Sequence, residues 1–244
     1  MAGFRGILIL TKPRRLNPER RGRETAEMAF PESARRAGPR RGAGPYPVGM
    51  EPVTLRTERL VLSLPTEADV DAITAACQDE GIQRYTTVPT PYTRVDAETF
   101  VQRVPQDWVV GQHLTWVIRE GEALVGTIGI YRIDGRGTGE IGYWVAPDQR
   151  GGGRLREAAN AVIDWGFAPA PKGLGLARME WRAVVGNVAS ARVAQALGFR
   201  HEGTLRQALV NSRGRDDGWI AALLSTDERM PQTWAILEDR PARP

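Results

Sequence analysis

One glycine-rich stretch of the sequence has the composition of a phosphate-binding turn. Residues 140–154 read Glu-Ile-Gly-Tyr-Trp-Val-Ala-Pro-Asp-Gln-Arg-Gly-Gly-Gly-Arg, with a strand pattern before the glycines and a helical pattern after them. Backbone N–H groups at the start of a helix are unpaired and partly positive, and glycines let a diphosphate approach them closely. Arg150, Arg154 and Arg156 add full positive charges. The run is neither a P-loop nor a G-x-G-x-x-G fingerprint. The prediction of a phosphate-binding turn therefore depends on the flanking strand and helix.

A second stretch, residues 186–199, combines a helix cap with a hydroxyl. Asn187 follows a predicted strand and is a natural N-cap for the helix that begins at Val188. Ser190 lies one turn into that helix, so its hydroxyl is expected to point toward whatever lies beside Asn187. Capping alone would explain Asn187, but a cap can also contact a ligand.

The elements that position these residues follow from the spacing of apolar residues. Three β-prone runs with short turns predict an antiparallel meander before the glycines, and strands and helices alternate after them. This order predicts an α/β (α+β) domain with a mixed sheet. We expect strands at 53–55, 60–62, 115–118, 124–131, 140–145, 177–183, 199–206 and 219–224, and helices at 66–77, 96–103, 155–166 and 188–197.

The positive charge of the chain is concentrated at its start. Residues 1–49 hold eleven Arg and Lys against four Asp and Glu, which leaves 22 basic and 25 acidic residues for 50–244. Residues 1–49 are rich in Arg, Pro and Gly, and they are expected to be a disordered tail or to precede a true start at Met50. Nucleic acid would then bind only non-specifically, through this tail. The expected domain spans 53–228, and 229–244 form a C-terminal tail.

Composition also limits the classes of function. The 244 residues contain one cysteine, Cys77, and two histidines, so neither a disulfide within the chain nor a metal site is expected. Cys77 fits the apolar face of a helix and is expected to be buried. No apolar run approaches the ~20 residues of a membrane span, so a cytoplasmic protein that does not enter the membrane is expected.

Both stretches resemble the GNAT superfamily of N-acetyltransferases, specifically its ribosomal-protein alanine N-acetyltransferase (RimJ/RimL-like) branch, over most of residues 53–228. The resemblance implies a mixed, mostly antiparallel central sheet flanked by helices. The family motif R/Q-x-x-G-x-G/A grips the pyrophosphate of acetyl-CoA, and here it falls on Arg150, Gly151, Gly152, Gly153, Arg154 and Leu155. Leu155 replaces the usual small residue, which would crowd the pyrophosphate or shift the helix.

The resemblance implies roles for further residues. The backbone of Tyr143, Trp144 and Val145 would pair with the pantetheine arm of acetyl-CoA. Asn187 would contact pantetheine, and Ser190 would lie near the thioester sulfur. The segment that carries Arg84, Tyr85 and Tyr92 resembles the wall of the acceptor site in this branch, although prolines and aromatic residues in a connection often serve packing alone.

The implied reaction is direct attack of a neutral amine on the acetyl-CoA thioester. Glu140 is the first candidate for the general base, unless it is only a solvated charge at the end of a strand. The N–H of Val145 would meet the oxyanion, and Ser190 or Tyr143 would donate a proton to the thiolate, with Ser190 preferred. No metal is required.

The acceptor is not determined by these residues. A protein N-terminal α-amine is expected from the RimJ/RimL-like branch, and an aminoglycoside or polyamine is the alternative, which an acidic acceptor cleft would favour. A degenerate acyl-CoA-binding module is a second alternative, motivated by Leu155. The chain could be a monomer or a homodimer.

Overall fold

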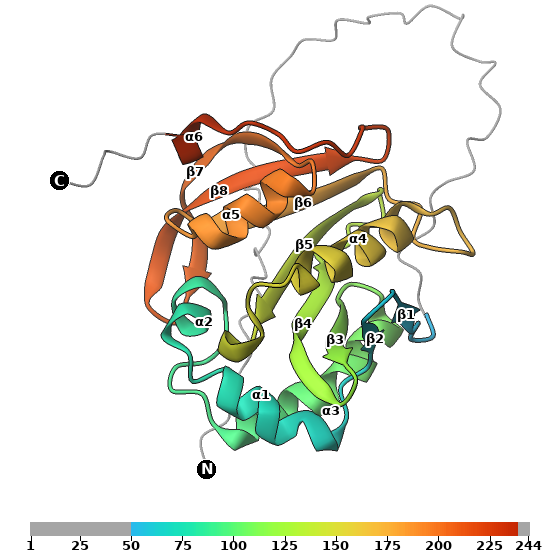
Figure 1. Ribbon diagram of the computed structural model, residues 1–244, viewed down its shortest axis with the longest axis vertical. Coiled ribbons are helices and arrows are strands. Elements are labelled where there is room, and N and C mark those ends of the chain that lie inside the picture. Colours follow the sequence, from blue (N-terminus) through green and yellow to red (C-terminus); the bar gives the residue numbers. More distant parts are fainter. Residues whose placement is uncertain (1–49, 239–244) are drawn as a thin grey trace, which may run out of the picture. The chain divides into compact units, whose positions relative to one another are not determined.

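The computed structural model describes residues 50–238, so the expected N-terminal tail and residues 239–244 lie outside the described part of the chain. Within it, eight strands form one sheet in the order β1-β2-β3-β4-β5-β6-β8-β7 (Figure 1). Neighbouring strands are antiparallel except β5 and β6, which are parallel. This sheet confirms the predicted fold class. The strands are β1 Leu55–Arg56, β2 Val61–Ser63, β3 Leu114–Glu120, β4 Ala123–Tyr131, β5 Thr138–Val145, β6 Arg178–Val184, β7 Arg200–Asn211 and β8 Gly214–Leu224.

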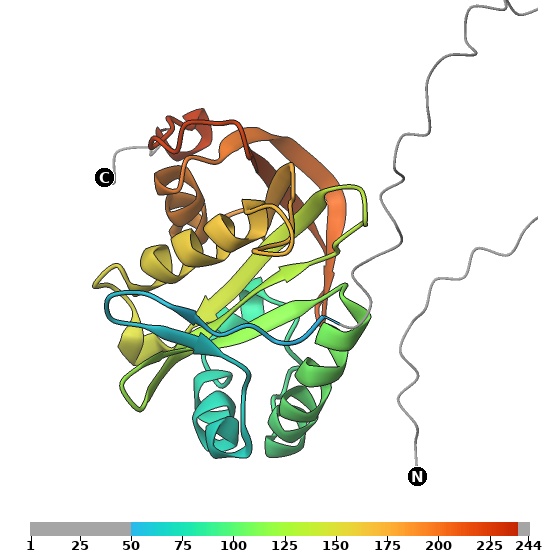
Figure 2. The same ribbon diagram turned by 90° about the vertical axis from the view of Figure 1, so that its right-hand side faces the viewer.

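Helices cover both faces of the sheet. Figures 1 and 2 show α1 and α3 on one face and α4 and α5 on the other. None of the helices between residues 50 and 238 is long and apolar enough to cross a membrane. The helices are α1 Val70–Ala76, α2 Glu80–Tyr85, α3 Arg94–Val110, α4 Arg154–Phe167, α5 Val188–Ala196 and α6 Ala235–Glu238, with short 3₁₀ helices at Glu67–Asp69 and Pro147–Gln149.

Local signals fix several helix ends. A capping box is present before α1, where the backbone N–H of Thr66 donates to the Asp69 carboxylate at 2.6 Å. Asp69 is buried and also pairs with Arg119 of β3, which ties the start of α1 to the sheet. Gly198 has a φ of +93° after α5, a left-handed conformation that ends the helix.

The central feature of the sheet is the incomplete pairing of its two parallel strands. β5 and β6 pair only from Thr138 to Ile141 and from Arg178 to Trp181, although β5 continues to Val145 and β6 to Val184. Beyond these residues the two strands separate, as Figure 1 shows. Backbone groups at the facing edges of β5 and β6 are therefore left without a ladder partner.

Two hydrophobic clusters fill the two faces. The larger one lies under α4 and α5 and contains Trp116, Ile141 and Phe199; the smaller one lies under α1 and α3 and contains Ile73 and Val117. Packing continues past the expected domain limit at residue 228, because Trp234 is 2% exposed and its Nε1 donates to the carbonyl of Phe199 at 3.0 Å.

The structure adds to the predicted elements in several places. Helix α3 continues through Pro105 to Val110, beyond the expected end at residue 103, and α6 was not predicted. Helix α2 occupies part of a segment with no predicted element; its six residues are too short to show a helical period. The β7–β8 hairpin is longer than predicted, because the register shifts between Leu205 and Leu209 and breaks the alternation of residue types.

Candidate active site

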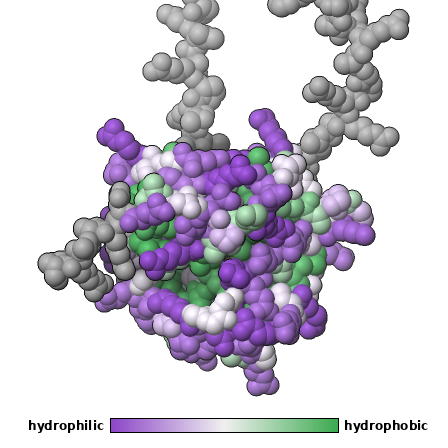
Figure 3. Space-filling model, turned by 45° about the horizontal axis from the view of Figure 1, so that its top comes forward, coloured by the Kyte–Doolittle hydropathy of each residue, from purple (hydrophilic) through white to green (hydrophobic). Residues whose placement is uncertain are grey.

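A cavity of about 1180 Å³ lies where β5 and β6 separate, and residues from both faces of the sheet line it. Side chains alternate along β5, so Glu140, Gly142 and Trp144 face α1 and α3, whereas Tyr143 and Val145 face α4 and α5. We call the α1 and α3 side the front chamber and the α4 and α5 side the rear chamber. On the surface seen in Figure 3, apolar side chains lie mainly inside hollows with hydrophilic rims. The gap between the strands joins the two chambers.

The glycine-rich turn forms one end of the rear chamber. Gly151, Gly152 and Gly153 have φ values of +82°, +61° and +75°, a left-handed conformation that favours glycine at all three positions. Helix α4 begins directly after them, and the N–H groups of residues 151–156 donate to no other residue in the described part of the chain. The turn thus presents a row of free N–H groups at a helix start, as a phosphate site requires.

The arginines around this turn differ in their partners. Arg150 donates to Asp79 at 2.6 Å and to the Val145 carbonyl at 3.3 Å, and its guanidinium holds the pKa of Asp79 below its usual range. Arg154 donates to Glu120 of β3 at 2.6 Å. Arg156 is exposed, lines the cavity and forms no ion pair with a residue between 50 and 238. Its full charge is therefore available to a ligand.

Leu155 occupies the position at which the sequence departs from the motif. Its side chain is half-buried and packs against the larger hydrophobic cluster while also lining the cavity. Part of the side chain therefore serves as core beneath the first turn of α4.

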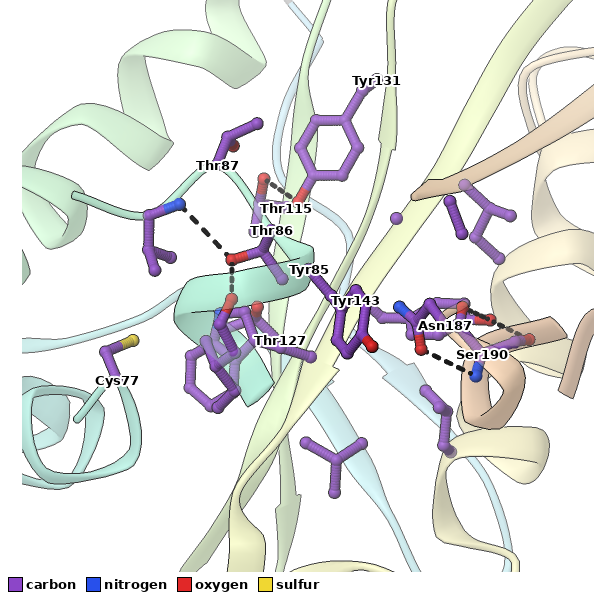
Figure 4. Close-up of a pocket in the computed structure, with 18 of the residues that line it drawn as sticks. Cys77, Tyr85, Thr86, Thr87, Thr115, Thr127, Tyr131, Tyr143, Asn187 and Ser190 are labelled. Atoms are coloured by element: carbon purple, nitrogen blue, oxygen red, sulfur yellow. Dashed lines mark hydrogen bonds between the residues drawn. The ribbon is translucent and has the colours of Figure 1, made fainter. Parts of the chain in front are cut away.

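A hydrogen-bond chain in the rear chamber connects β6, α5 and β5. Trp181 Nε1 donates to Ser190 Oγ at 3.0 Å, and Ser190 Oγ donates to the Tyr143 hydroxyl at 3.1 Å. The Tyr143 hydroxyl donates in turn to the Ser190 carbonyl at 3.3 Å. Burial raises the pKa of Tyr143 to about 12, so its hydroxyl stays protonated at neutral pH. The structure therefore brings Ser190 and Tyr143 together (Figure 4).

Asn187 holds the start of α5. Its side-chain oxygen accepts from the Ser190 N–H at 3.3 Å, which confirms the predicted N-cap. The Asn187 side chain also lines the cavity and lies beside Ser190 in Figure 4. The amide NH₂ of Asn187 remains available for a ligand.

Glu140 lies on the opposite face of β5, in the front chamber. It pairs with Arg132 at 2.8 Å and lies 3.5 Å from Arg182 of β6, and its side chain is 16% exposed. Burial raises the pKa of Glu140, while the two arginines oppose this shift. Glu140 is thus a largely buried, paired carboxylate rather than a solvated charge at a strand end.

The floor of the front chamber contains a tyrosine that lies over two glycines. The Tyr131 hydroxyl accepts from Thr115 Oγ1 at 3.3 Å (Figure 4). A Cβ at Gly129 would lie 2.7 Å from the Tyr131 hydroxyl, and a Cβ at Gly142 would lie 3.0 Å from its ring. Both glycines therefore allow the ring to lie flat across β4 and β5, with its hydroxyl in the chamber.

Of the three residues expected in the acceptor wall, Tyr85 and Tyr92 line the cavity, whereas Arg84 does not. Arg84 forms two hydrogen bonds with Asp216 of β8, at 2.9 and 3.1 Å. Tyr85 donates to the Gly186 carbonyl at 3.5 Å and so links α2 to the turn before α5. Tyr92 is 8% exposed and belongs to the smaller hydrophobic cluster, so packing dominates its surroundings.

Several residues that line the cavity or hold its neighbouring side chains were not predicted from the sequence. Trp181 holds Ser190, and Asp79 and Asp216 hold arginines of the site. Tyr131 and Leu209 line the cavity directly. Only Tyr131 had a local signal, since Gly129 precedes it by two residues on β4 and Gly142 lies opposite Gly129 on β5. Between residues 50 and 238, no group of three His, Cys, Asp or Glu side chains is placed to hold a metal ion.

Comparison with known proteins identifies this arrangement. A family model described as an acetyltransferase (GNAT) domain matches residues 59–200. The N-acetyltransferase YoaA of Bacillus subtilis is 30% identical over 156 residues, which cover 63% of this chain and 86% of YoaA. Among solved structures, RimL, a ribosomal L7/L12 alpha-N-protein acetyltransferase in complex with coenzyme A, superposes with a TM-score of 0.62 at 20% identity. The match covers 70% of this chain and 98% of RimL. RimJ of Mycobacterium smegmatis, in complex with CoA-disulfide, superposes with a TM-score of 0.61 at 21% identity. The match covers 71% of this chain and 86% of RimJ.

We expect the thiol of Cys77 to be unreactive in the native protein. Cys77 is fully buried beside the front chamber, and burial raises its pKa to about 12, so almost no thiolate forms at pH 8. Labelling with a disulfide reagent at pH 8 should modify no thiol in the native chain and one thiol per chain in urea. Rapid labelling of native protein would contradict this burial.

Proposed function

Because the chain belongs to the GNAT family of acetyltransferases, which transfer the acetyl group of acetyl-CoA, we propose that its acceptor is the α-amine at the N-terminus of a protein. One observation carries this proposal: the front chamber is spacious, and two of its three acidic side chains already pair with arginines. An acceptor with a single amine on a largely neutral body fits such a chamber better than a polycation does.

The partners of the three acidic groups in the front chamber support this point. Asp96 accepts from the backbone N–H of Thr93 at 2.8 Å, and Asp107 pairs with Arg103 at 3.3 Å. Glu140 pairs with Arg132. An aminoglycoside or polyamine carries several positive charges and needs unpaired carboxylates to offset them. The size of the cavity, about 1180 Å³, exceeds that of typical single-ligand pockets and leaves room for two substrates.

Acetyl-CoA is proposed to bind along the rear chamber. The free N–H groups after Arg150 and the charge of Arg156 would hold the pyrophosphate. The pantetheine arm would pair with the unpaired edge of β5 at Tyr143, Trp144 and Val145, because no strand occupies that edge beyond Ile141. Asn187 would donate to the same arm. The side chain of Trp144 packs against the smaller hydrophobic cluster, so its backbone would make this contact.

The two faces of β5 would then supply the groups that act on the amine and on the leaving thiolate. The amine reaches the thioester from the front chamber, where Glu140 takes its proton directly or through one water. The nitrogen attacks the carbonyl carbon, and the N–H of Val145 donates to the oxyanion. The C–S bond breaks as the carbonyl re-forms, and the thiolate leaves on the rear side, near Ser190 and Tyr143.

The pKa of Tyr143 defines its part in this step. A thiol titrates near 8.5, so complete proton transfer from a hydroxyl with a pKa of about 12 is uphill by roughly 5 kcal/mol. Tyr143 and Ser190 therefore stabilise the thiolate by hydrogen bonding, and the proton that finally reaches sulfur comes from solvent.

A substitution in the glycine turn separates cofactor binding from backbone strain. Gly151→Ala places a methyl group among the free N–H groups at a φ of +82°, where it meets no protein atom within 4 Å. We expect the Kd for CoA, measured by calorimetry, to rise by roughly tenfold or more, since the methyl group blocks close approach of the diphosphate. Gly121→Ala is the matched control, because Gly121 has a φ of +59°, open surroundings and a position in the β3–β4 turn. Equal CoA affinity in both variants would refute the phosphate role.

Replacing the proposed base or the proposed hydrogen-bond donor to the thiolate should slow turnover and spare acetyl-CoA binding. Glu140→Gln is expected to lower kcat about 100-fold and Ser190→Ala about tenfold. Activity of the wild-type enzyme should fall as the pH drops through the pKa of Glu140, which lies above the ordinary carboxyl value, and Glu140→Gln should lose this acidic limb. An unchanged pH profile of kcat/KM in Glu140→Gln would remove Glu140 as the base.

A panel of candidate amines tests the identity of the acceptor. Thiol release from acetyl-CoA is measured with peptides that carry a free N-terminus, with the same peptides blocked at the N-terminus, and with spermidine and an aminoglycoside. The proposal predicts turnover on free peptides and at least tenfold lower kcat/KM on the other compounds. Preference for the polycations would overturn the proposed acceptor, and binding of CoA without turnover on any amine would indicate a degenerate acyl-CoA-binding module.

A further inference from the structure

We infer that Leu209, displaced by a bulge in β7, forms a size-limiting wall of the front chamber and determines how bulky a group can stand next to the acceptor amine. The inference rests on acetyl transfer at this site. It extends the proposed function, because it concerns which amines are accepted.

The bulge is the first element of this argument. Leu205 pairs with Gly218 and Leu209 pairs with Asp216, so three residues of β7 stand opposite Asp217 alone. Gln207, in the middle of the bulge, has a φ of +51°, which is uncommon for a residue with a side chain. Its backbone N–H donates to Asp217 Oδ1 at 2.8 Å, which fixes this conformation. The bulge is therefore held in one shape.

The position of Leu209 depends on a glycine in the partner strand. A Cβ at Gly218 would lie 2.7 Å from Leu209 Cγ and 2.8 Å from its Cδ1, so the leucine occupies the space that a side chain at position 218 would fill. Gly218 pairs with Val184 at the separated end of β6. Leu209 thus lies over Gly218 of β8, the strand residue paired with Val184, and both Leu209 and Val184 line the cavity.

The part of the β7–β8 hairpin beyond the bulge is anchored to helix α2. Asp216 accepts two hydrogen bonds from Arg84 of α2 and one from Asn211 at 2.6 Å. The pair with Arg84 is about three-quarters buried on the Asp216 side, whose side chain is 24% exposed. These hydrogen bonds hold the hairpin in place when a larger acceptor enters, so the size of the space beside Leu209 is fixed.

Two substitutions should move acceptor preference in opposite directions. Leu209→Ala widens the chamber, and Gly218→Ala pushes the Leu209 side chain out of its place and narrows it. We measure kcat/KM with peptides that begin with Gly, Ala, Val, Leu or Phe, and with primary alkylamines of increasing bulk. The ratio for bulky over small acceptors should rise about tenfold in Leu209→Ala and fall about tenfold in Gly218→Ala. CoA affinity should be unchanged in both variants.

Leu224→Ala is the matched control, since Leu224 lies in β8, where it pairs with Arg178 of β6, and does not line the cavity. The ranking of acceptors should stay as in the wild-type chain. Unchanged ranking in Leu209→Ala and Gly218→Ala, with both proteins folded by circular dichroism, overturns the inference. If only the alkylamines are acetylated, the proposed protein acceptor fails, and the same ratios within the amine series still support or refute the role of Leu209.

Discussion

The early end of the hydrogen-bonded ladder between β5 and β6 is the constraint on which the site depends. Two strands that stay paired to Ile141 and Trp181 and then separate leave backbone donors and acceptors exposed inside a sheet. Such groups are costly to bury without partners. The gap is therefore suited to an extended ligand with amide groups, and it also connects the two faces of the sheet. A donor substrate on one face and an acceptor on the other can meet only there.

The charged residues of the site are held by partners rather than left free. Arg84, Arg150 and Arg154 each pair with a carboxylate from a distant element, and Glu140 is paired with Arg132. Ion pairs at exposed positions add little to stability. Their consequence here is geometric, because they tie α2, the glycine turn and the β7–β8 hairpin to one another. The walls of the cavity are thereby positioned by ion pairs as well as by the hydrophobic clusters beneath them.

The sequence was sufficient for those parts of the fold and site that depend on local signals. Three features each depend on consecutive residues: the alternation in β3, β4 and β5, the glycine turn before α4, and the cap of Asn187 on α5. Helix α2 has six residues and no period, and the bulge at Gln207 interrupts the pattern of β7, so neither could be predicted. The contacts of Trp181 with Ser190 and of Asp79 with Arg150 join residues whose proximity depends on the finished fold, the second pair across 71 positions.

The carboxylate of Asp79 links helix α2 to Arg150, which stands before the glycine-rich turn. One of its oxygens accepts from the first turn of α2, at the N–H of Ile82, and from the guanidinium of Arg150. A diphosphate that attracts Arg150 competes with Asp79 for the same cation. When the cation shifts, Asp79 keeps its bond to α2 but loses a neutralising neighbour, so the helix beside the acceptor gains local negative charge. Filling one half of the cavity thus changes the electrostatic potential that the second substrate meets at the other half.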